Sequence, residues 1–222
     1  MMRVCRQSLR NRFVHWGIAL TCFGLIFTGV LQMPVAKRYG MQAIGDWTTD
    51  YFATLPLHYG FGIVFTVLCL FHVLVHALEG DFDIVPKKGD IGRSAAVIKA
   101  MLSGTDEPPS EKYLPEQRLA WAAFAAVFAL VIGTGWIKTL KNLAGWDLAD
   151  PALFWLAQLH NLGMVLTIVL FLGHMAAFAF KPNRMLLPAM TRGTVDAQYA
   201  AHRHSLWKPQ KQDGGLCGAP RR

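Results

Sequence analysis

Residues 151–180 read PALFWLAQLHNLGMVLTIVLFLGHMAAFAF and contain no Asp, Glu, Lys or Arg. Three other stretches of 19 residues or more share this property, namely residues 13–36, 51–78 and 119–137. A helix rises about 1.5 Å per residue, so roughly 20 residues cross a hydrocarbon core about 30 Å thick. The sequence therefore predicts an all-α membrane protein with four transmembrane helices, spanning about residues 12–33, 56–78, 119–138 and 152–180.

The overall composition agrees with this prediction and excludes several other classes of protein. The chain has 222 residues, of which 53% are hydrophobic and 16% charged, and its net charge is +8. A disordered chain is poor in apolar residues, and a soluble, basic nucleic-acid-binding protein is rarely so apolar. The segments between the spans are too short to build a large soluble core. The first stretch exceeds the roughly 7–15 apolar residues of a signal peptide, so we expect a retained first helix.

The basic residues are unevenly distributed between the loops. Of the 22 Lys and Arg residues, 18 lie in the N-terminal segment, residues 79–118 and residues 181–222, and four lie in the two remaining loops. Cytoplasmic loops carry an excess of Lys and Arg. We therefore expect a multi-pass protein of the bacterial cytoplasmic (inner) membrane, with both termini and a loop at 79–118 on the cytoplasmic side.

The predicted cytoplasmic loop and the tail have features of their own. Residues 91–102 fit a short amphipathic helix at the membrane surface. Its apolar face would carry Ile91, Ala95, Ile98 and Leu102, with Val97 and Met101 beside them. We expect residues 1–210 to form one four-helix domain and residues 211–222 to form a disordered C-terminal tail.

Histidine is the recurring ionisable residue of the predicted spans, which contain His15, His58, His72, His160 and His174. An ionisable group inside a bilayer is costly and by default indicates a functional site. His58 and His160 have similar depths near the outer ends of their helices, and His15 and His174 have similar depths near the inner ends. His160 and His174 are 14 residues apart, which corresponds to roughly 21 Å along one helix and about 40° around it.

Two levels with a pair of histidines at each are what a di-haem cytochrome b requires, because a neutral imidazole binds iron through one ring nitrogen. His72 competes with His15 for the inner level, since it lies 14 residues from His58 on one helix face. The scheme with His58, His72, His160 and His174 is that of the cytochrome b of quinol:cytochrome c reductases, and spacing does not decide between the two.

Other chemistries fit the spans less well. Zinc sites usually include Cys or carboxylate ligands, and the spans contain no Asp or Glu. A small His-dependent, proton-coupled transporter is the alternative from a different class, although such a transporter usually keeps a buried carboxylate.

A set of motifs runs in order along the chain. It begins with Arg12-Phe13-Val14-His15-Trp16 and continues with Leu57-His58 and Gly62, Pro86-Lys87-Lys88-Gly89-Asp90-Ile91, Lys112-Tyr113 and Gln117-Arg118, Leu159-His160, Gly173-His174, and the tail from Gly193-Thr194-Val195 to His202-Arg203-His204-Ser205-Leu206-Trp207. This set resembles the respiratory formate dehydrogenase gamma subunits, including their R-x-x-H-W opening, and the related hydrogenase b-type cytochromes. The resemblance covers nearly the whole chain.

The resemblance implies a four-transmembrane-helix bundle that holds two b-type haems, with no catalytic residue of its own. His58 and His160 are then the axial ligands of the outer haem, and His15 and His174 those of the inner haem. In this family, electrons come from a molybdopterin catalytic (alpha) subunit through an iron–sulfur (beta) subunit on the outer face and leave to menaquinone near the cytoplasmic side. A formate dehydrogenase is the expected complex, and a thiosulfate reductase or a hydrogenase-type complex is the alternative.

One segment departs from the family pattern. Where the family has N-x-G-Q beside its quinone site, this chain has Leu114-Pro115-Glu116-Gln117. The resemblance places Glu116, Gln117 and His174 at the expected quinone site. Leu114 lacks the side-chain hydrogen bond that Asn offers to a quinone carbonyl. Glu116 is interpreted either as a proton carrier for the quinone or as a solvated loop carboxylate, and the simpler second interpretation is preferred.

Overall fold

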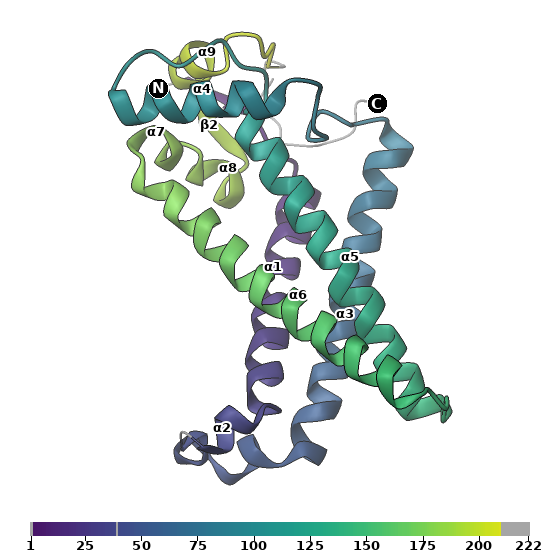
Figure 1. Ribbon diagram of the computed structural model, residues 1–222. Coiled ribbons are helices and arrows are strands. Elements are labelled where there is room, and N and C mark those ends of the chain that lie inside the picture. The colour runs from purple at the N-terminus through teal and green to yellow at the C-terminus, as the bar shows by residue number, and fades with distance from the viewer. Residues whose placement is uncertain (1, 39, 210–222) are drawn as a thin grey trace. The chain divides into compact units, whose positions relative to one another are not determined.

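The computed structural model describes residues 2–38 and 40–209, and four long helices account for most of them. These helices are α1 (Leu9–Leu31), α3 (Tyr51–Glu79), α5 (Pro115–Ala144) and α6 (Asp150–Ala176) (Figure 1). Each is long and apolar enough to cross a membrane, and at most 22% of its most apolar window is buried inside the protein. The four helices expected from the sequence are therefore present as candidate membrane spans, by their length and apolar composition.

The helices extend beyond the predicted spans at most of their ends. Helix α3 begins five residues before Pro56, whose ring removes one backbone donor near the start of the helix. Helix α5 continues through Lys138 and Lys141 to Ala144, because a lysine can keep its stem along an apolar surface and its charge in water. Gly145, with φ of +66°, follows the last residue of α5 and supplies the left-handed conformation that commonly ends a helix.

Shorter elements fill the connections. Between α1 and α3 lie α2 (Pro34–Arg38) and two 3-10 helices, η1 (Met41–Ile44) and η2 (Asp46–Thr49). Helix α4 (Asp90–Ser103) lies between α3 and α5. After α6 come η3 (Ala177–Ala179), α7 (Lys181–Arg184), α8 (Leu187–Thr191) and α9 (Ala197–Arg203). The described residues form an all-α fold, as predicted, with one small addition: β1 (Arg3–Cys5) pairs antiparallel with β2 (Thr194–Asp196).

The described residues divide into two compact units. The terminal unit contains residues 2–13, 76–128 and 165–209, and the central unit contains residues 14–38, 40–75 and 129–164. The predicted single domain of residues 1–210 is thus built from two units that share the long helices. The predicted disordered tail at 211–222 lies outside the described residues.

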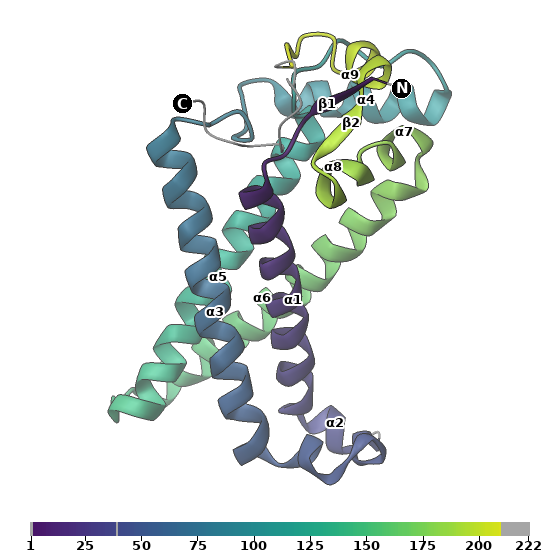
Figure 2. The same ribbon diagram turned by 180° about the vertical axis from the view of Figure 1, so that it is seen from behind.

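The terminal unit brings the N-terminal segment, the 79–118 segment and the C-terminal segment together. Val4 pairs with Val195 across the two strands and packs with Ala189 and Ala200 in a small core. Helix α9 lies beside α4 in both views (Figures 1 and 2), and an Arg203 guanidinium nitrogen is 3.4 Å from the sulfur of Met101 on α4. These contacts hold together three segments that are far apart in the sequence.

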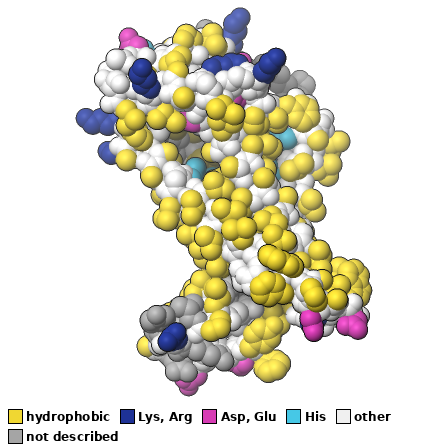
Figure 3. All heavy atoms as spheres, viewed as in Figure 1, with side chains coloured by type: hydrophobic (Ala, Val, Ile, Leu, Met, Phe, Trp, Pro, Cys, Tyr) yellow, Lys and Arg dark blue, Asp and Glu magenta, His cyan; other side chains and the backbone are white. Residues whose placement is uncertain are grey.

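Helix α4 confirms the short helix predicted for residues 91–102. Its buried face carries Asp90, Ser94 and Val97, whereas Ile91 is 78% exposed and Leu102 is 69% exposed. Ile91, Ala95, Ile98 and Leu102 of the predicted apolar face are therefore exposed, as expected of a helix that lies on a membrane surface, whereas Val97 is buried. Figure 3 shows hydrophobic side chains over the long helices, and most of the visible Lys and Arg side chains over the terminal unit.

Candidate functional site

Two of the predicted site residues face each other inside the central unit. His58 comes from the N-terminal third of α3, and His160 comes from α6. Their ring centroids are 6.3 Å apart and the ring planes are inclined by 73°. The two rings come from positions about a hundred residues apart in the sequence, so this pairing is a product of the fold.

A threonine hydroxyl lies at the Nδ1 atom of each ring. The Oγ1 atom of Thr28, on α1, is 2.9 Å from Nδ1 of His58, and the Oγ1 atom of Thr134, on α5, is 2.8 Å from Nδ1 of His160. Both threonines are almost fully buried. Neither threonine was predicted from the sequence. They share the dipeptide Thr-Gly, as Thr28-Gly29 and Thr134-Gly135, but its meaning becomes clear only from the structure.

The other predicted pair is divided between the two units. His15 lies in the central unit, where its ring meets Trp16 edge-on at 5.7 Å. His174 lies in the terminal unit, where its ring meets Phe124 and Phe178 edge-on at 6.2 and 5.7 Å. Phe124 lies seven residues after Gln117 on α5, so both are on one face of that helix, roughly 10 Å apart along its axis.

His72 occupies the same level of the central unit as His15. A side-chain carbon at Gly17 would meet Leu68, and one at Gly24 would meet Phe61. These two contacts fix an antiparallel register between α1 and α3, which places position 15 opposite positions near 70. His15 and His72 are therefore both available at one level, and the competition between them that the sequence left open persists in the structure.

The residues of the expected quinone site have distinct environments in the terminal unit. The side-chain oxygen of Gln117 accepts a hydrogen bond from the backbone N–H of Leu114 at 3.2 Å, which caps the start of α5. Leu114 is fully buried. Both carboxylate oxygens of Glu116 are buried, with no hydrogen-bond partner among the described residues. These buried oxygens, in the first turn of α5, do not fit the interpretation of Glu116 as a solvated loop carboxylate.

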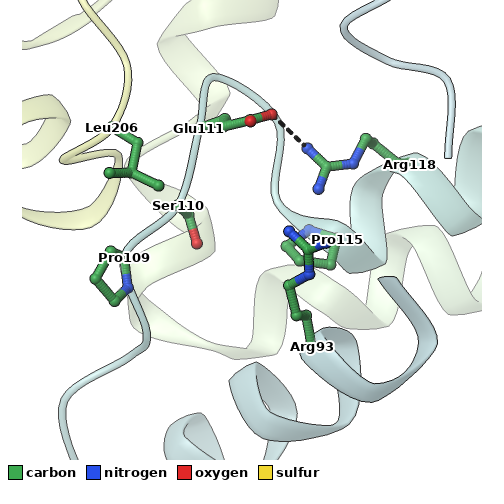
Figure 4. A pocket seen from close by; sticks show the side chains of 7 residues that line it. All are labelled: Arg93, Pro109, Ser110, Glu111, Pro115, Arg118 and Leu206. Atoms are coloured by element: carbon green, nitrogen blue, oxygen red, sulfur yellow. Dashed lines mark hydrogen bonds and ion pairs between the residues drawn. The ribbon is translucent and has the colours of Figure 1, made fainter. Parts of the chain in front are cut away.

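A pocket opens on the surface of the terminal unit near the start of α5. Its walls come from the chain before and at the start of α5, from α4 and from the C-terminal segment, and the lining residues are Arg93, Pro109, Ser110, Glu111, Pro115, Arg118 and Leu206 (Figure 4). Arg118 donates to Glu111 at 3.1 Å and, with two nitrogens, to Asp90 at 2.7 and 2.9 Å. Since the charge of Arg118 is already matched and no predicted haem ligand lines this pocket, it is not the redox site.

A family model described as prokaryotic cytochrome b561 matches residues 6–193 of the chain. This match covers all four long helices and every histidine of the predicted spans. The chain belongs to the prokaryotic cytochrome b561 family. A search of the curated proteins finds no match. Membership makes the chain a multi-pass membrane cytochrome of the b type that takes part in electron transfer, and the family binds b-type haem.

The spacing of the His58 and His160 rings matches that of two imidazoles on opposite sides of one iron atom. Metal–nitrogen bonds of about 2.0 Å, with each ring centroid roughly 1.1 Å beyond its nitrogen, place two opposed imidazoles about 6 Å apart. The observed separation is 6.3 Å. The described residues contain no cluster of three or more His, Cys, Asp or Glu that could hold a bare ion. A cytochrome b needs only two protein ligands, because the porphyrin supplies the other four nitrogens.

Proposed function

We propose that the chain is the membrane subunit of a respiratory complex of the formate dehydrogenase type and carries two b-type haems. Family membership supports the cytochrome part of this proposal, and the opposed rings of His58 and His160 carry it at the level of residues. The formate dehydrogenase part rests on the ordered motifs, from Arg12-x-x-His15-Trp16 to the tail. On its own the subunit is not an enzyme, and its chemistry is electron transfer between its partners and a quinone.

The proposed ligand sets are His58 with His160 for the outer haem and His15 with His174 for the inner haem. His72 is the rival of His15, because both lie at one level of the central unit. The distinguishing experiment compares His15→Ala with His72→Ala. We expect His15→Ala to lose the inner haem and His72→Ala to retain it, and the reverse result would assign the ligand to α3.

The proposed orientation places the terminal unit on the cytoplasmic side. Three basic segments meet there, including Arg6, which donates to the backbone carbonyl of Lys112, and an excess of basic residues is typical of that side. The quinone, which we take to be menaquinone, would bind near Glu116, Gln117 and His174. The buried and unpaired carboxylate of Glu116 supports a role in proton exchange with the quinone rather than a contact with water.

The proposed partners are an iron–sulfur subunit on the outer face and, through it, a molybdopterin subunit. The test is to purify the chain from bacterial membranes in a mild detergent and to identify the proteins that accompany it. We expect both partner subunits and formate-dependent reduction of the b-type absorption band. Reduction by hydrogen in place of formate would indicate a hydrogenase-type complex, and oxidation of the reduced band by thiosulfate would indicate a thiosulfate reductase, so either result would overturn the formate assignment.

A further inference from the structure

Two helix pairs of the central unit repeat one arrangement of three residues. In the first pair, Thr28-Gly29 on α1 faces His58 on α3, and in the second pair, Thr134-Gly135 on α5 faces His160 on α6. In each pair the threonine hydroxyl lies at Nδ1 of the ring. A side-chain carbon added to the following glycine would lie 3.5 Å from Cε1 of His58 in the first pair and 3.3 Å from Cε1 of His160 in the second. His58 and His160 therefore sit in two copies of the same three-residue arrangement.

The direction of both Thr–His hydrogen bonds follows from counting protons. Thr28 donates its single hydroxyl proton to the carbonyl of Gly24 at 2.7 Å, and Thr134 donates its proton to the carbonyl of Leu130 at 2.7 Å. A threonine hydroxyl has one donor and two lone pairs. Each Oγ1 atom must therefore accept, which makes Nδ1 of each histidine the donor. With the proton on Nδ1, the Nε2 atom of each ring keeps a free lone pair, which is the form that binds iron.

We propose that Thr28 and Thr134 are positioning residues that fix the tautomer and orientation of the two outer haem ligands and thereby set the potential of that haem. The proposal rests on the proposed function, in which His58 and His160 bind one haem. The partners of the remaining ring nitrogen orient a metal-bound imidazole and raise its basicity. Each threonine is held by its own bond to the helix backbone, so its lone pair stays directed at the ring.

Close packing of the helices keeps these threonines within reach. A carbon added to Gly163, one turn after His160, would lie 2.4 Å from a methyl carbon of Val131 on α5. A carbon added to Gly24, one turn before Thr28, would lie 2.7 Å from the ring of Phe61 on α3. A side chain at either position would force Val131 or Phe61 to move, and small residues of this kind let membrane helices approach each other. Each helix pair is thus locked one turn from its Thr–His hydrogen bond.

The test uses Thr28→Val and Thr134→Val, which keep the shape of the side chain but remove the acceptor. A ring without this acceptor is a weaker electron donor and stabilises ferric iron less, so we expect a higher midpoint potential for one haem only. The apparent affinity for that haem should fall by roughly 10- to 100-fold. Thr28→Ser and Thr134→Ser keep the hydroxyl and should restore both quantities. The readouts are a potentiometric titration of the haem absorbance and haem transfer to apomyoglobin.

Thr21→Val and Thr139→Val are the matched controls. Thr21 on α1 and Thr139 on α5 make the same hydroxyl bond to their own helix, at 2.7 and 2.9 Å, so their loss should leave both haem potentials unchanged. The proposal is overturned if Thr28→Val and Thr134→Val behave like these controls or shift different haems. A wild-type protein without haem would instead refute the proposed function. Retention of the second haem shows that a variant is folded, and Thr28→Ala replaces Thr28→Val if that variant is not.

Discussion

Asp90 and Arg118 form a buried ion pair between the first turn of α4 and the first turn of α5. Their side chains are 1% and 2% exposed. The two hydrogen bonds from Arg118 hold the pKa of Asp90 at about 2, well below the value of a free carboxyl group. A pair with this geometry fixes α4 against the start of a membrane helix. Removing Asp90 leaves the buried charge of Arg118 with the half-exposed Glu111 as its remaining carboxylate partner among the described residues.

Asp90→Ala should therefore lower the free energy of unfolding of the terminal unit by about 3–5 kcal/mol. The measurement is a denaturant titration in detergent, followed by hydrogen exchange of the α4 amides. Glu79→Ala is the matched control, because Glu79 pairs with Arg10 in an ion pair that is 39% and 47% exposed and such exposed pairs contribute roughly 0–1 kcal/mol. Equal losses in the two variants would show that burial of the Asp90–Arg118 pair has no special effect.

Single residues also show how far the sequence predicts the candidate site. The equal depth of His58 and His160 was predictable, because helical rise and span ends fix depth. The roles of Thr28 and Thr134 were not predictable, because a threonine in a membrane helix normally bonds to its own backbone. The sequence gives no sign of a second hydrogen-bond partner. Glu116 was misinterpreted because its burial depends on packing among segments that are distant in sequence.

At the scale of elements, apolar stretches predict the four long helices, and the heptad-like spacing of Ile91, Ala95, Ile98 and Leu102 predicts α4. The strands β1 and β2 were not predictable, since three residues are too few to show alternation and each strand exists only through the other. The C-terminal helix α9 depends on its N-cap, where the Asp196 carboxylate accepts from the backbone N–H groups of Gln198 and Tyr199.

The end of α9 should make the terminal unit sensitive to acid. His204 is fully buried, and its Nδ1 atom is 2.7 Å from the carbonyl of Glu111. Burial, together with the nearby charges of Arg6 and Arg203, lowers the pKa of His204 to about 4. Between about pH 6.5 and 4 the unfolded chain binds a proton that the folded unit does not, so stability should decline by up to roughly 1.4 kcal/mol per pH unit as the pH falls.

Hydrogen exchange of the α9 amides at several pH values measures this decline. Asp90, on α4, stays charged in the folded protein over this pH range, because its pKa there is about 2. His204→Gln removes the titrating group and should flatten the pH dependence above pH 4. A wild-type protein whose α9 protection is constant from pH 7 to 4.5 would contradict this account of His204.

At the scale of the whole molecule, the basic residues lead to a prediction of topology. The terminal unit contains the N-terminal segment, the 79–118 segment and the C-terminal segment up to residue 209. Reporter fusions should place residue 209 and the 103–110 segment in the cytoplasm, and positions 46 and 147 on the outer side. An alkaline phosphatase fusion that is active at residue 209 would reverse the proposed orientation.

The central claim is that one b-type haem is held jointly by His58 and His160, and its most direct test is the haem content of purified variants. Pyridine haemochrome assays with potentiometric titration should find two b-type haems in the wild type. His58→Ala and His160→Ala should each lose the same redox component, and the double variant should lose no more than either single variant. A wild-type protein without haem, or single variants that lose different components, would contradict the claim.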